Sequence, residues 1–304
     1  MKLAFLCSPD MMPDTAARNP YDAEGNEQLE KIIPALDKRG ISLERVDWRR
    51  SRHRAGEFDA FLPLFAWDYW DAREAFVETL HDLARQARVL NPPSMIDWNT
   101  DKSYLLELEC KGVPTIPMQM VERVTKSDIE HAFETFGTDK LVVKPRVGGG
   151  GFGQSVFNRG QDLNERSLPT SPAIIQPFQD FIEIEGEVTT VWFGGRYSHA
   201  LRKVPKAGDY RVQSHYGGHE EPCVASPEHI AVAKAALAVL PEVPLYARID
   251  LLKGNDGRIN VMEVELIEPY FYLAMAPETE GDLCGASLFA RAVEQTLDQK
   301  QRSK

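Results

Sequence analysis

The sequence predicts an open, largely parallel α/β sheet in the N-terminal hundred residues, followed by α+β domains. Two observations support this division. Strand and helix signals alternate with short connections up to about residue 100, which is typical of a parallel sheet covered by helices. From there on, helices and antiparallel hairpins occur in separate blocks, which is typical of α+β domains.

The first hundred residues supply each element of the predicted N-terminal sheet. Short apolar runs bounded by polar or turn residues predict its strands. Leu29, Ile32 and Leu36 recur at helical spacing ahead of a stop at Gly40. The expected strands lie at 3–7, 41–46, 58–65 and 88–91, and the expected helices at 24–40 and 71–87.

The remaining two hundred residues contain clear helix starts and one clear hairpin. Ser127 and Glu130 predict a capping box, and Ser226 followed by a proline is a favoured helix start. The Asp-Gly pair in "KGNDGR" separates two apolar runs and predicts a hairpin. The expected helices lie at 101–112, 127–137, 227–240 and 285–298, and the expected strands at 117–122, 140–145, 154–158, 173–178, 187–193, 196–204, 245–252 and 259–267.

The composition limits the function classes. The 304 residues carry a formal net charge of −11, so no excess of Lys and Arg can neutralise a nucleic-acid backbone. The basic cluster at 45–54 is interpreted as a solvated strand edge. No apolar run approaches the ~18 residues that span a bilayer, and the four cysteines lack the spacing of a zinc site or a disulfide framework. We expect a reduced, cytoplasmic protein with no nucleic-acid or membrane partner.

A glycine-rich stretch, "LVVKPRVGGGGFGQSVF" at 141–157, predicts a phosphate-binding lid. Gly148, Gly150 and Gly153 satisfy GxGxxG, but a strand follows instead of a helix, which excludes a nicotinamide dinucleotide fold. No Lys-Ser/Thr pair follows the glycines, which excludes a P-loop. A glycine hairpin can fold over a triphosphate while Lys144 supplies a charge. The alternative is a flexible surface hairpin without a ligand.

The hairpin at 248–269 predicts a metal site. Residues two apart on a strand share a face, so Glu263 and Glu265 point the same way, with Asp250 on the partner strand. Three carboxylates on one face repel each other unless a cation neutralises them, and oxygen ligands of this kind suit Mg²⁺. The alternative is an ordinary solvated strand face.

Five motifs in this order resemble the ATP-grasp superfamily, most closely its glutathione-synthetase-like branch. The resemblance predicts an ATP-grasp small subdomain at 101–178 and a large one at 179–304, after the N-terminal domain at 1–100. In place of the asparagine that often holds the last metal position of the family, this chain has Glu265, which keeps an oxygen ligand. The motifs are at 91–117, 141–157, 174–188, 200–218 and 248–269.

The resemblance also implies site residues and cofactors. ATP would be held by two lysines, by the glycine lid, by a hinge that hydrogen-bonds adenine and by an acid on the ribose. The metal would be two Mg²⁺ ions, replaceable by Mn²⁺. The implied nucleotide residues are Lys102, Lys144, Gly149, Gly150, Gly151, Gln176, Pro177, Phe178 and Glu187; the implied metal ligands are Asp250, Glu263 and Glu265; the implied catalytic and substrate residues are Arg202, Arg211, Gly217 and Gly218.

The implied function is an ADP-forming ligase that joins a small-molecule carboxylate to an amine through an acyl phosphate. Arg202 would stabilise the acyl phosphate, Arg211 would hold a substrate carboxylate, and the amides of Gly217 and Gly218 could meet an oxyanion. "EVELIEPYFYL" at 263–273 resembles a subgroup that includes the cyclo-ligase that makes cycloserine. Two alternatives stay open: an intramolecular cyclo-ligase, and an ATP-binding sensor or partner-binding module without catalysis. A homodimer is a family expectation.

Two further features of the sequence allow more than one interpretation. His215 and His219 have HxxxH spacing, but the glycines between them disfavour a helix, so we expect loop histidines near the substrate in place of a zinc pair. The aromatic stretch at 67–76 is expected to pack in the core or between domains, with a substrate contact as the alternative.

Overall fold

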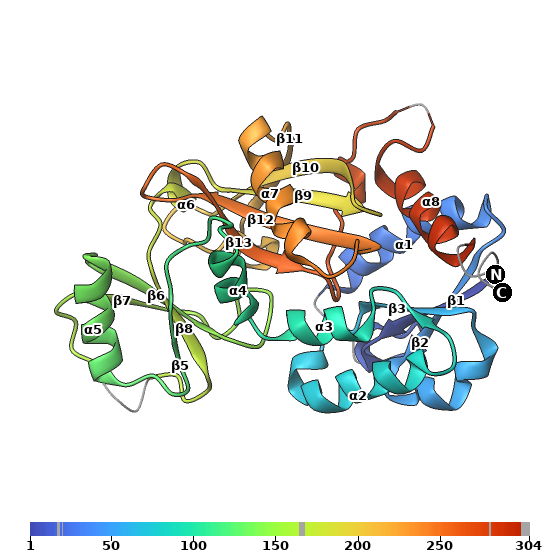
Figure 1. The fold of residues 1–304 in the computed structure, drawn as a ribbon, viewed down its shortest axis with the longest axis horizontal. Coiled ribbons are helices and arrows are strands. Elements are labelled where there is room, and N and C mark those ends of the chain that lie inside the picture. Colours follow the sequence, from blue (N-terminus) through green and yellow to red (C-terminus); the bar gives the residue numbers. More distant parts are fainter. Residues whose placement is uncertain (17–18, 20, 164–167, 280, 299–304) are drawn as a thin grey trace.

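The computed structural model describes residues 1–16, 19, 21–163, 168–279 and 281–298. Over these residues the strands form three sheets, and the linker between the first and second runs beneath the third (Figure 1). The predicted fold class, a parallel α/β sheet followed by α+β structure, is confirmed, and the α+β part contains two antiparallel sheets. Within the described part of the chain, no helix combines the length and the apolar character that crossing a membrane requires.

The N-terminal sheet is parallel throughout, in the order β2-β1-β3-β4. Its central strands are buried along almost their whole length because helices cover both faces. The elements are β1 (Lys2–Cys7), α1 (Asp22–Asp37), β2 (Ser42–Asp47), β3 (Ala60–Phe65), α2 (Arg73–Ala84) and β4 (Arg88–Val89).

The basic cluster differs from the solvated strand edge that was expected. After β2, residues Trp48–Glu57 form a 3₁₀ helix, and its arginines pair with carboxylates. Arg52 lies 3.1 Å from Asp82, and Arg54 lies 2.7 Å from Glu44. The cluster is therefore neutralised within the fold.

A helical linker leads to the small antiparallel sheet, whose order is β5-β8-β6-β7. Helix α3 was not predicted, and the capping box of α5 starts at Thr125, two residues before the predicted Ser127. The N-cap is Thr125, whose hydroxyl accepts from the Asp128 amide at 3.2 Å. The elements are α3 (Pro93–Thr100), α4 (Tyr104–Cys110), β5 (Gln119–Val121), α5 (Lys126–Phe136), β6 (Lys140–Pro145), β7 (Ser155–Asn158) and β8 (Ala173–Pro177).

The large sheet has the order β11-β10-β9-β12-β13, and all its pairings are antiparallel. Helix α7 covers one face, and its predicted start is confirmed because the Ser226 hydroxyl caps the helix. The elements are α6 (Phe181–Ile184), β9 (Glu187–Phe193), β10 (Arg196–Val204), β11 (His219–Cys223), α7 (Pro227–Val239), β12 (Tyr246–Lys253), β13 (Ile259–Glu265) and α8 (Gly285–Asp298).

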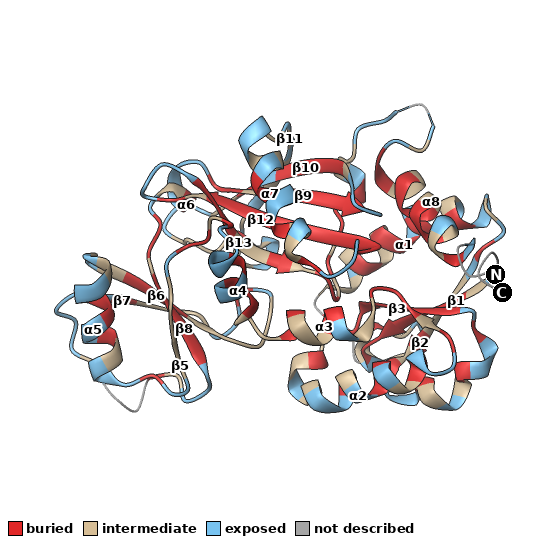
Figure 2. Ribbon diagram, viewed as in Figure 1, coloured by how far each residue is buried: buried red, intermediate tan, exposed pale blue. Residues whose placement is uncertain are grey.

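One apolar core joins the two ends of the chain. Helix α8 packs on α1, and the core includes Phe5 and Phe65 from the N-terminal sheet together with Phe193 from β9 and Phe289 from α8. Buried residues follow the strands of the N-terminal sheet and of the large sheet, whereas exposed residues gather on loops and outer helix faces (Figure 2). The N-terminal sheet and the large sheet therefore share buried surface, which fixes the N-terminal sheet beside the large one.

Candidate active site

The three predicted metal-ligating carboxylates lie together on one face of the large sheet. Asp250 on β12 is the cross-strand partner of Glu263 on β13, and Glu265 follows two residues later. One carboxylate oxygen from each lies within 4.8 Å of the others. Val264, between the two glutamates, is buried on the opposite face. Strand alternation therefore separates the charged face from the apolar one.

The linker holds the outer edge of β13. The Asn99 amide donates to the Val264 carbonyl at 2.7 Å and accepts from the Leu266 amide at 2.8 Å. The Tyr104 hydroxyl accepts from the Val264 amide at 2.9 Å. These side chains take the place of a neighbouring strand, and they fix the backbone on both sides of Glu265.

Two buried cations, which the sequence analysis missed, lie beside the carboxylates. Lys203 Nζ lies 2.9 Å from Glu187 and 3.1 Å from Asp250. The guanidinium of Arg248 donates to both oxygens of Asp250, at 3.1 and 2.8 Å, and also pairs with Glu265. Burial disfavours the charged form of Asp250, but Arg248 and Lys203 outweigh burial and hold its pKa well below the usual range. Burial raises the pKa of Glu265 to about 7, although Arg248 opposes the shift.

The carboxylate cluster fits a hard divalent cation. Asp250 already accepts four hydrogen bonds, from Thr189, Lys203 and two nitrogens of Arg248. Glu263 has a single ion pair, with Lys102 at 2.9 Å. Glu263 and Glu265 are therefore the more open ligands, and oxygen ligands of this type are those that Mg²⁺ takes.

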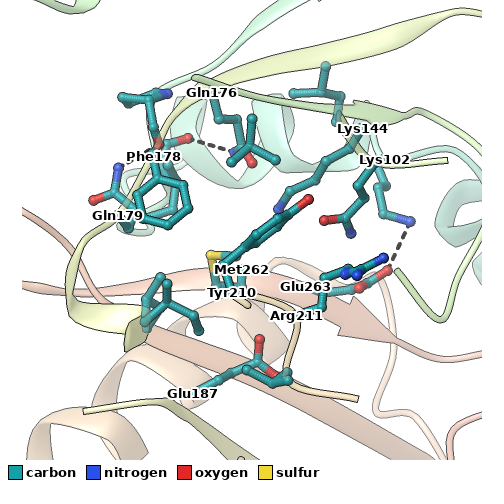
Figure 3. Close-up of a pocket in the computed structure, with 18 of the residues that line it drawn as sticks. Lys102, Lys144, Gln176, Phe178, Gln179, Glu187, Tyr210, Arg211, Met262 and Glu263 are labelled. Carbon is teal, nitrogen blue, oxygen red and sulfur yellow. Dashed lines mark hydrogen bonds and ion pairs between the residues drawn. The ribbon is translucent and has the colours of Figure 1, made fainter. Parts of the chain in front are cut away.

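A first cavity lies between the small sheet and the large sheet (Figure 3). Lys102 and Lys144 enter it from the linker and β6, and Glu187 and Glu263 enter from the large sheet. Burial lowers the pKa of Lys144, and the positive charge of Lys102 adds to that shift. The apolar part of the wall comprises Leu105, Ile116, Val142, Ile174, Pro177, Phe178, Ile182, Val212, Leu252 and Met262, and the polar part adds Gln154, Gln176, Gln179, Tyr210, Arg211 and Gln213. A largely apolar cavity with two lysines suits a nucleotide base and its phosphates.

The glycine loop is folded down over the site. Lys102 Nζ donates to the Gly148 carbonyl at 2.5 Å. Gly150 and Gly151 have φ values of +62° and +73°, which favour glycine over residues with a Cβ. Phe152, at the tip, stacks on His215 with 5.3 Å between ring centroids, and His215 lies 3.0 Å from the Tyr21 hydroxyl. The loop thus meets both the 211–216 segment and the N-terminal part of the chain.

A second cavity lies beneath this loop, next to the carboxylates. The N-terminal segment supplies part of its wall, and the 268–272 segment supplies another part. That segment is held by Trp67, whose indole donates to the Glu268 carbonyl at 2.8 Å, and by Gln28, which accepts from the Phe271 amide at 2.6 Å. The lining combines acids (Glu24, Glu187, Glu220, Asp250, Glu263, Glu265, Glu268), rings (Tyr21, Trp67, Trp70, Phe152, Tyr270, Tyr272) and two bases (Lys203, Arg248).

Comparisons with known proteins agree with this geometry. Residues 4–91 match the family described as the N-terminal domain of D-cycloserine synthetase DcsG. The chain is 29% identical over 291 residues to the cycloserine biosynthesis protein DcsG of Streptomyces lavendulae, covering 88% of this chain and 92% of that one. The crystal structure of D-cycloserine synthetase DcsG superposes with a TM-score of 0.81 at 25% identity, over 98% of this chain and 100% of the other.

A D-alanine–D-alanine ligase from Bacillus anthracis shares the fold, with a TM-score of 0.70 and 17% identity over 100% of this chain and 99% of its own. The chain is an ATP-grasp ligase. Its reaction class is the ATP-dependent joining of a carboxylate to an amine. The two cavities adjoin, and Glu187, Gln213 and Glu263 line both of them.

The predicted hinge lines the first cavity, but some of its backbone groups already make hydrogen bonds within the protein. Gln176, Pro177 and Phe178 all border the first cavity. The Phe178 amide, however, donates to the Lys140 carbonyl at 2.9 Å, and the Phe178 carbonyl accepts from Asn255 at 3.0 Å. Glu187 lines both cavities and pairs with Lys203.

Asn255 ties the hinge to the turn of the metal-binding hairpin. Its side-chain oxygen accepts from the Asp180 amide at 2.9 Å, and its own amide donates to the Gln179 side chain at 2.8 Å. Residues 178–180 are thus held by a residue between β12 and β13.

The structure does not bring Arg202 into the ATP-grasp site. On β10, Arg202 and Lys203 point to opposite faces, and Arg202 lies on the face that α7 covers. Its side chain is 46% exposed, with Glu221 at 3.9 Å. Lys203, the next residue, points into the second cavity instead.

Two other predicted placements are also corrected. The amides of Gly217 and Gly218 donate to the carbonyls of Ser214 and Gln213, so they close a turn and are not available to an oxyanion. Arg211 lines the first cavity, paired in a fork with Asp209 and lying 3.6 Å from the Tyr216 ring centroid. It therefore lines the first cavity and is not among the residues that line the second.

The two histidines have different surroundings. His215 lies under the tip of the glycine loop, whereas His219 is exposed at the start of β11. Among the described residues, the group of His, Cys, Asp and Glu side chains close enough to share a metal is Asp250, Glu263 and Glu265. The aromatic stretch proves mixed: Tyr69 is in the core, and Trp67 and Trp70 line the second cavity.

Proposed function

We propose that this ligase closes a ring within one small molecule: ATP activates the carboxylate, and a nitrogen of the same molecule attacks it. The carboxylate oxygen attacks the γ-phosphorus of ATP, ADP leaves, and an acyl phosphate forms. The nitrogen then attacks the carbonyl carbon, loses a proton and displaces phosphate. The net covalent change in the substrate is the loss of one water.

The side chains divide this reaction between the two cavities. Lys102 and Lys144 neutralise phosphate charge in the first cavity, and the glycine loop covers the phosphates with backbone N–H groups. Lys203 and Arg248, in place of Arg202, stabilise the acyl phosphate in the second cavity.

Mg²⁺ bound at Asp250, Glu263 and Glu265 would screen the repulsion between phosphates and carboxylate. We propose two ions, with Mn²⁺ as a substitute, because Glu263 and Glu265 together offer more free oxygens than one ion needs from protein.

The number of free N–H groups on the basic residues of the second cavity supports ring closure. The basic residues of the second cavity, as far as the chain is described, are Lys203 and Arg248. Two of the three N–H groups of Lys203 are taken, by Glu187 and Asp250. Four of the five of Arg248 are taken, by Asp250, Glu265 and the Tyr270 carbonyl.

One N–H on each residue is left, which is enough for a single carboxylate or acyl phosphate. An acceptor such as a second amino acid would bring a carboxylate for which these two side chains have no further N–H group, at a high desolvation cost. A substrate that carries both reacting groups avoids this cost. The relative DcsG is, by name, the synthetase of a cyclic product, D-cycloserine.

The test measures ADP release with ATP, Mg²⁺ and a panel of amino acids. The panel includes both enantiomers of 2,4-diaminobutyrate and ornithine, whose side-chain amines can close lactams, and D-alanine as an intermolecular substrate. We expect ADP release with a ring-closing compound and a product lighter by one water in the mass spectrum. Release with D-alanine and a dipeptide product would contradict ring closure while keeping the ligase assignment.

A further inference from the structure

The second cavity contains acids that neither the metal nor the acyl phosphate needs. Glu220 on β11 is the cross-strand partner of Lys203, so its side chain shares the face that carries the reaction. The Tyr272 hydroxyl is hydrogen-bonded to its carboxylate. Within the described residues, no Lys or Arg lies within ion-pair distance of Glu220, and it lines the cavity together with Glu24 and Glu268.

The surroundings of Glu220 favour a cation. Tyr270 and Tyr272 stand edge to face with centroids 4.6 Å apart, and both line the cavity. Aromatic faces next to a carboxylate are the usual receptor for an ammonium group. Lys203 Nζ and Arg248 Cζ already lie 5.6 and 5.8 Å from the centroid of the Tyr272 ring. Burial raises the pKa of Glu220, although Lys203, the Tyr272 hydroxyl and Arg248 oppose the shift, and the charge of Glu24 adds to it. A bound positive charge would relieve both effects.

A second, independent observation points to a ligand that donates N–H groups. Gln213 lines both cavities, and its side-chain oxygen is buried without a hydrogen-bond partner among the described atoms. A buried acceptor without a donor costs about 1–3 kcal/mol, which a ligand N–H can offset. Carboxylates, rings and a free acceptor thus meet in one cavity.

We infer that Glu220 determines specificity by binding a protonated amino group that the substrate keeps through the reaction. Resting on the proposed ring closure, this defines the substrate class: an amino acid with one carboxylate, one nucleophilic nitrogen and a separate ammonium group. The ammonium group lies between Glu220 and the rings of Tyr270 and Tyr272, while the carboxylate faces Lys203 and Arg248.

The chain offers a matched control one residue away. Glu221 follows Glu220 on the same strand but points to the other face, with its side chain 47% exposed and 3.9 Å from Arg202. Glu220→Gln and Glu221→Gln remove the same charge from the same strand. The first change affects the cavity, and the second does not.

The experiment measures Kd by calorimetry with Mg²⁺ and a non-hydrolysable ATP analogue present. The ligands are D-2,4-diaminobutyrate, its L enantiomer, and 4-aminobutyrate, which lacks only the α-amino group. We expect wild-type enzyme and E221Q to prefer one diamino acid over 4-aminobutyrate by about 10- to 100-fold, as a charge-assisted hydrogen bond provides. We expect E220Q to lose that preference and to bind the ATP analogue as wild type does.

The inference is overturned if the wild type binds all three ligands equally or none of them, or if E220Q keeps the preference. Thermal unfolding midpoints of the two variants check that both fold. The outcome is separable from that of the proposed function: ADP release with the panel tests ligation, whereas the Kd ratio tests Glu220. Retained ADP release together with an unchanged Kd ratio would refute only the Glu220 inference.

Discussion

The two cavities share a wall but differ in chemistry. Glu187, Gln213 and Glu263 line both of them. The first is a mostly apolar slot with Lys102 and Lys144, whereas the second is acidic and aromatic, with its two bases tied to carboxylates. The first can hold a molecule that brings its own negative charge. The second requires a ligand, or a ligand with metal, that brings positive charge.

The strongest test of this difference is to remove the buried cation of the second cavity. We expect Lys203→Met to lower the free energy of unfolding by about 3–5 kcal/mol, because Glu187 and Asp250 lose a buried partner. Arg202→Met, one residue away on the other face, should change it by less than about 0.5 kcal/mol. Urea unfolding measures both, and equal effects would contradict the opposite orientation of the two side chains.

Removal of a shared carboxylate should affect catalysis more than folding. We expect Glu263→Gln to lower turnover by at least about 10²-fold, because the metal site loses its most open ligand. ADP release measures the loss. Asp256→Asn on the exposed turn of the same hairpin is the control, and similar rates for the two variants would refute the metal assignment.

The pH dependence of folding stability should depend on His199, which lines neither cavity. Burial lowers the pKa of His199 to about 4, and its Nε2 lies 2.8 Å from the Phe271 carbonyl. Between pH 6.5 and 4 the unfolded state binds the proton and the folded state does not, so stability falls as pH falls. The slope has a ceiling of about 1.4 kcal/mol per pH unit.

His199→Gln should remove this part of the pH dependence, which amounts to about 2 kcal/mol at pH 5. Chemical unfolding of both proteins at pH 7.5 and pH 5 measures it. An unchanged pH dependence in the variant would assign the acid sensitivity to other groups.

The smallest expected effect separates the ligands of the two cavities. Lys144→Met should raise KM for ATP about tenfold, the value of one charge-assisted hydrogen bond, and leave KM for the amino acid nearly unchanged. Steady-state kinetics with each substrate varied in turn provides the measurement. A rise in the amino-acid KM alone would reverse the roles of the cavities.

Local patterns predicted the fold class and the carboxylate cluster. Alternation along one strand places Glu263 and Glu265 together, and a short turn brings Asp250 beside them. The glycine loop could be recognised because positive φ values require glycine, whichever residues surround it.

Which residues of β10 face the cavities could not be predicted in the same way. The family resemblance favoured Arg202, but whether it or Lys203 faces the site depends on register across the β9–β10 turn and on an irregularity between Tyr197 and His199. Lys203 could have been found from its cross-strand partner Glu187, had the register been known. Tyr21, Trp67 and Tyr270 meet only through tertiary packing, which leaves no local signal.

The contacts of Asn255 have a mechanical consequence. They bind residues 178–180, where the chain passes from the small sheet to the large one, to the turn that closes the metal hairpin. Any swing of the small sheet must pivot beside this asparagine, which is on the same hairpin as the metal ligands. We therefore expect that opening the first cavity would move the glycine loop and Lys144 with the small sheet, while Asp250, Glu263 and Glu265 would stay with the large sheet.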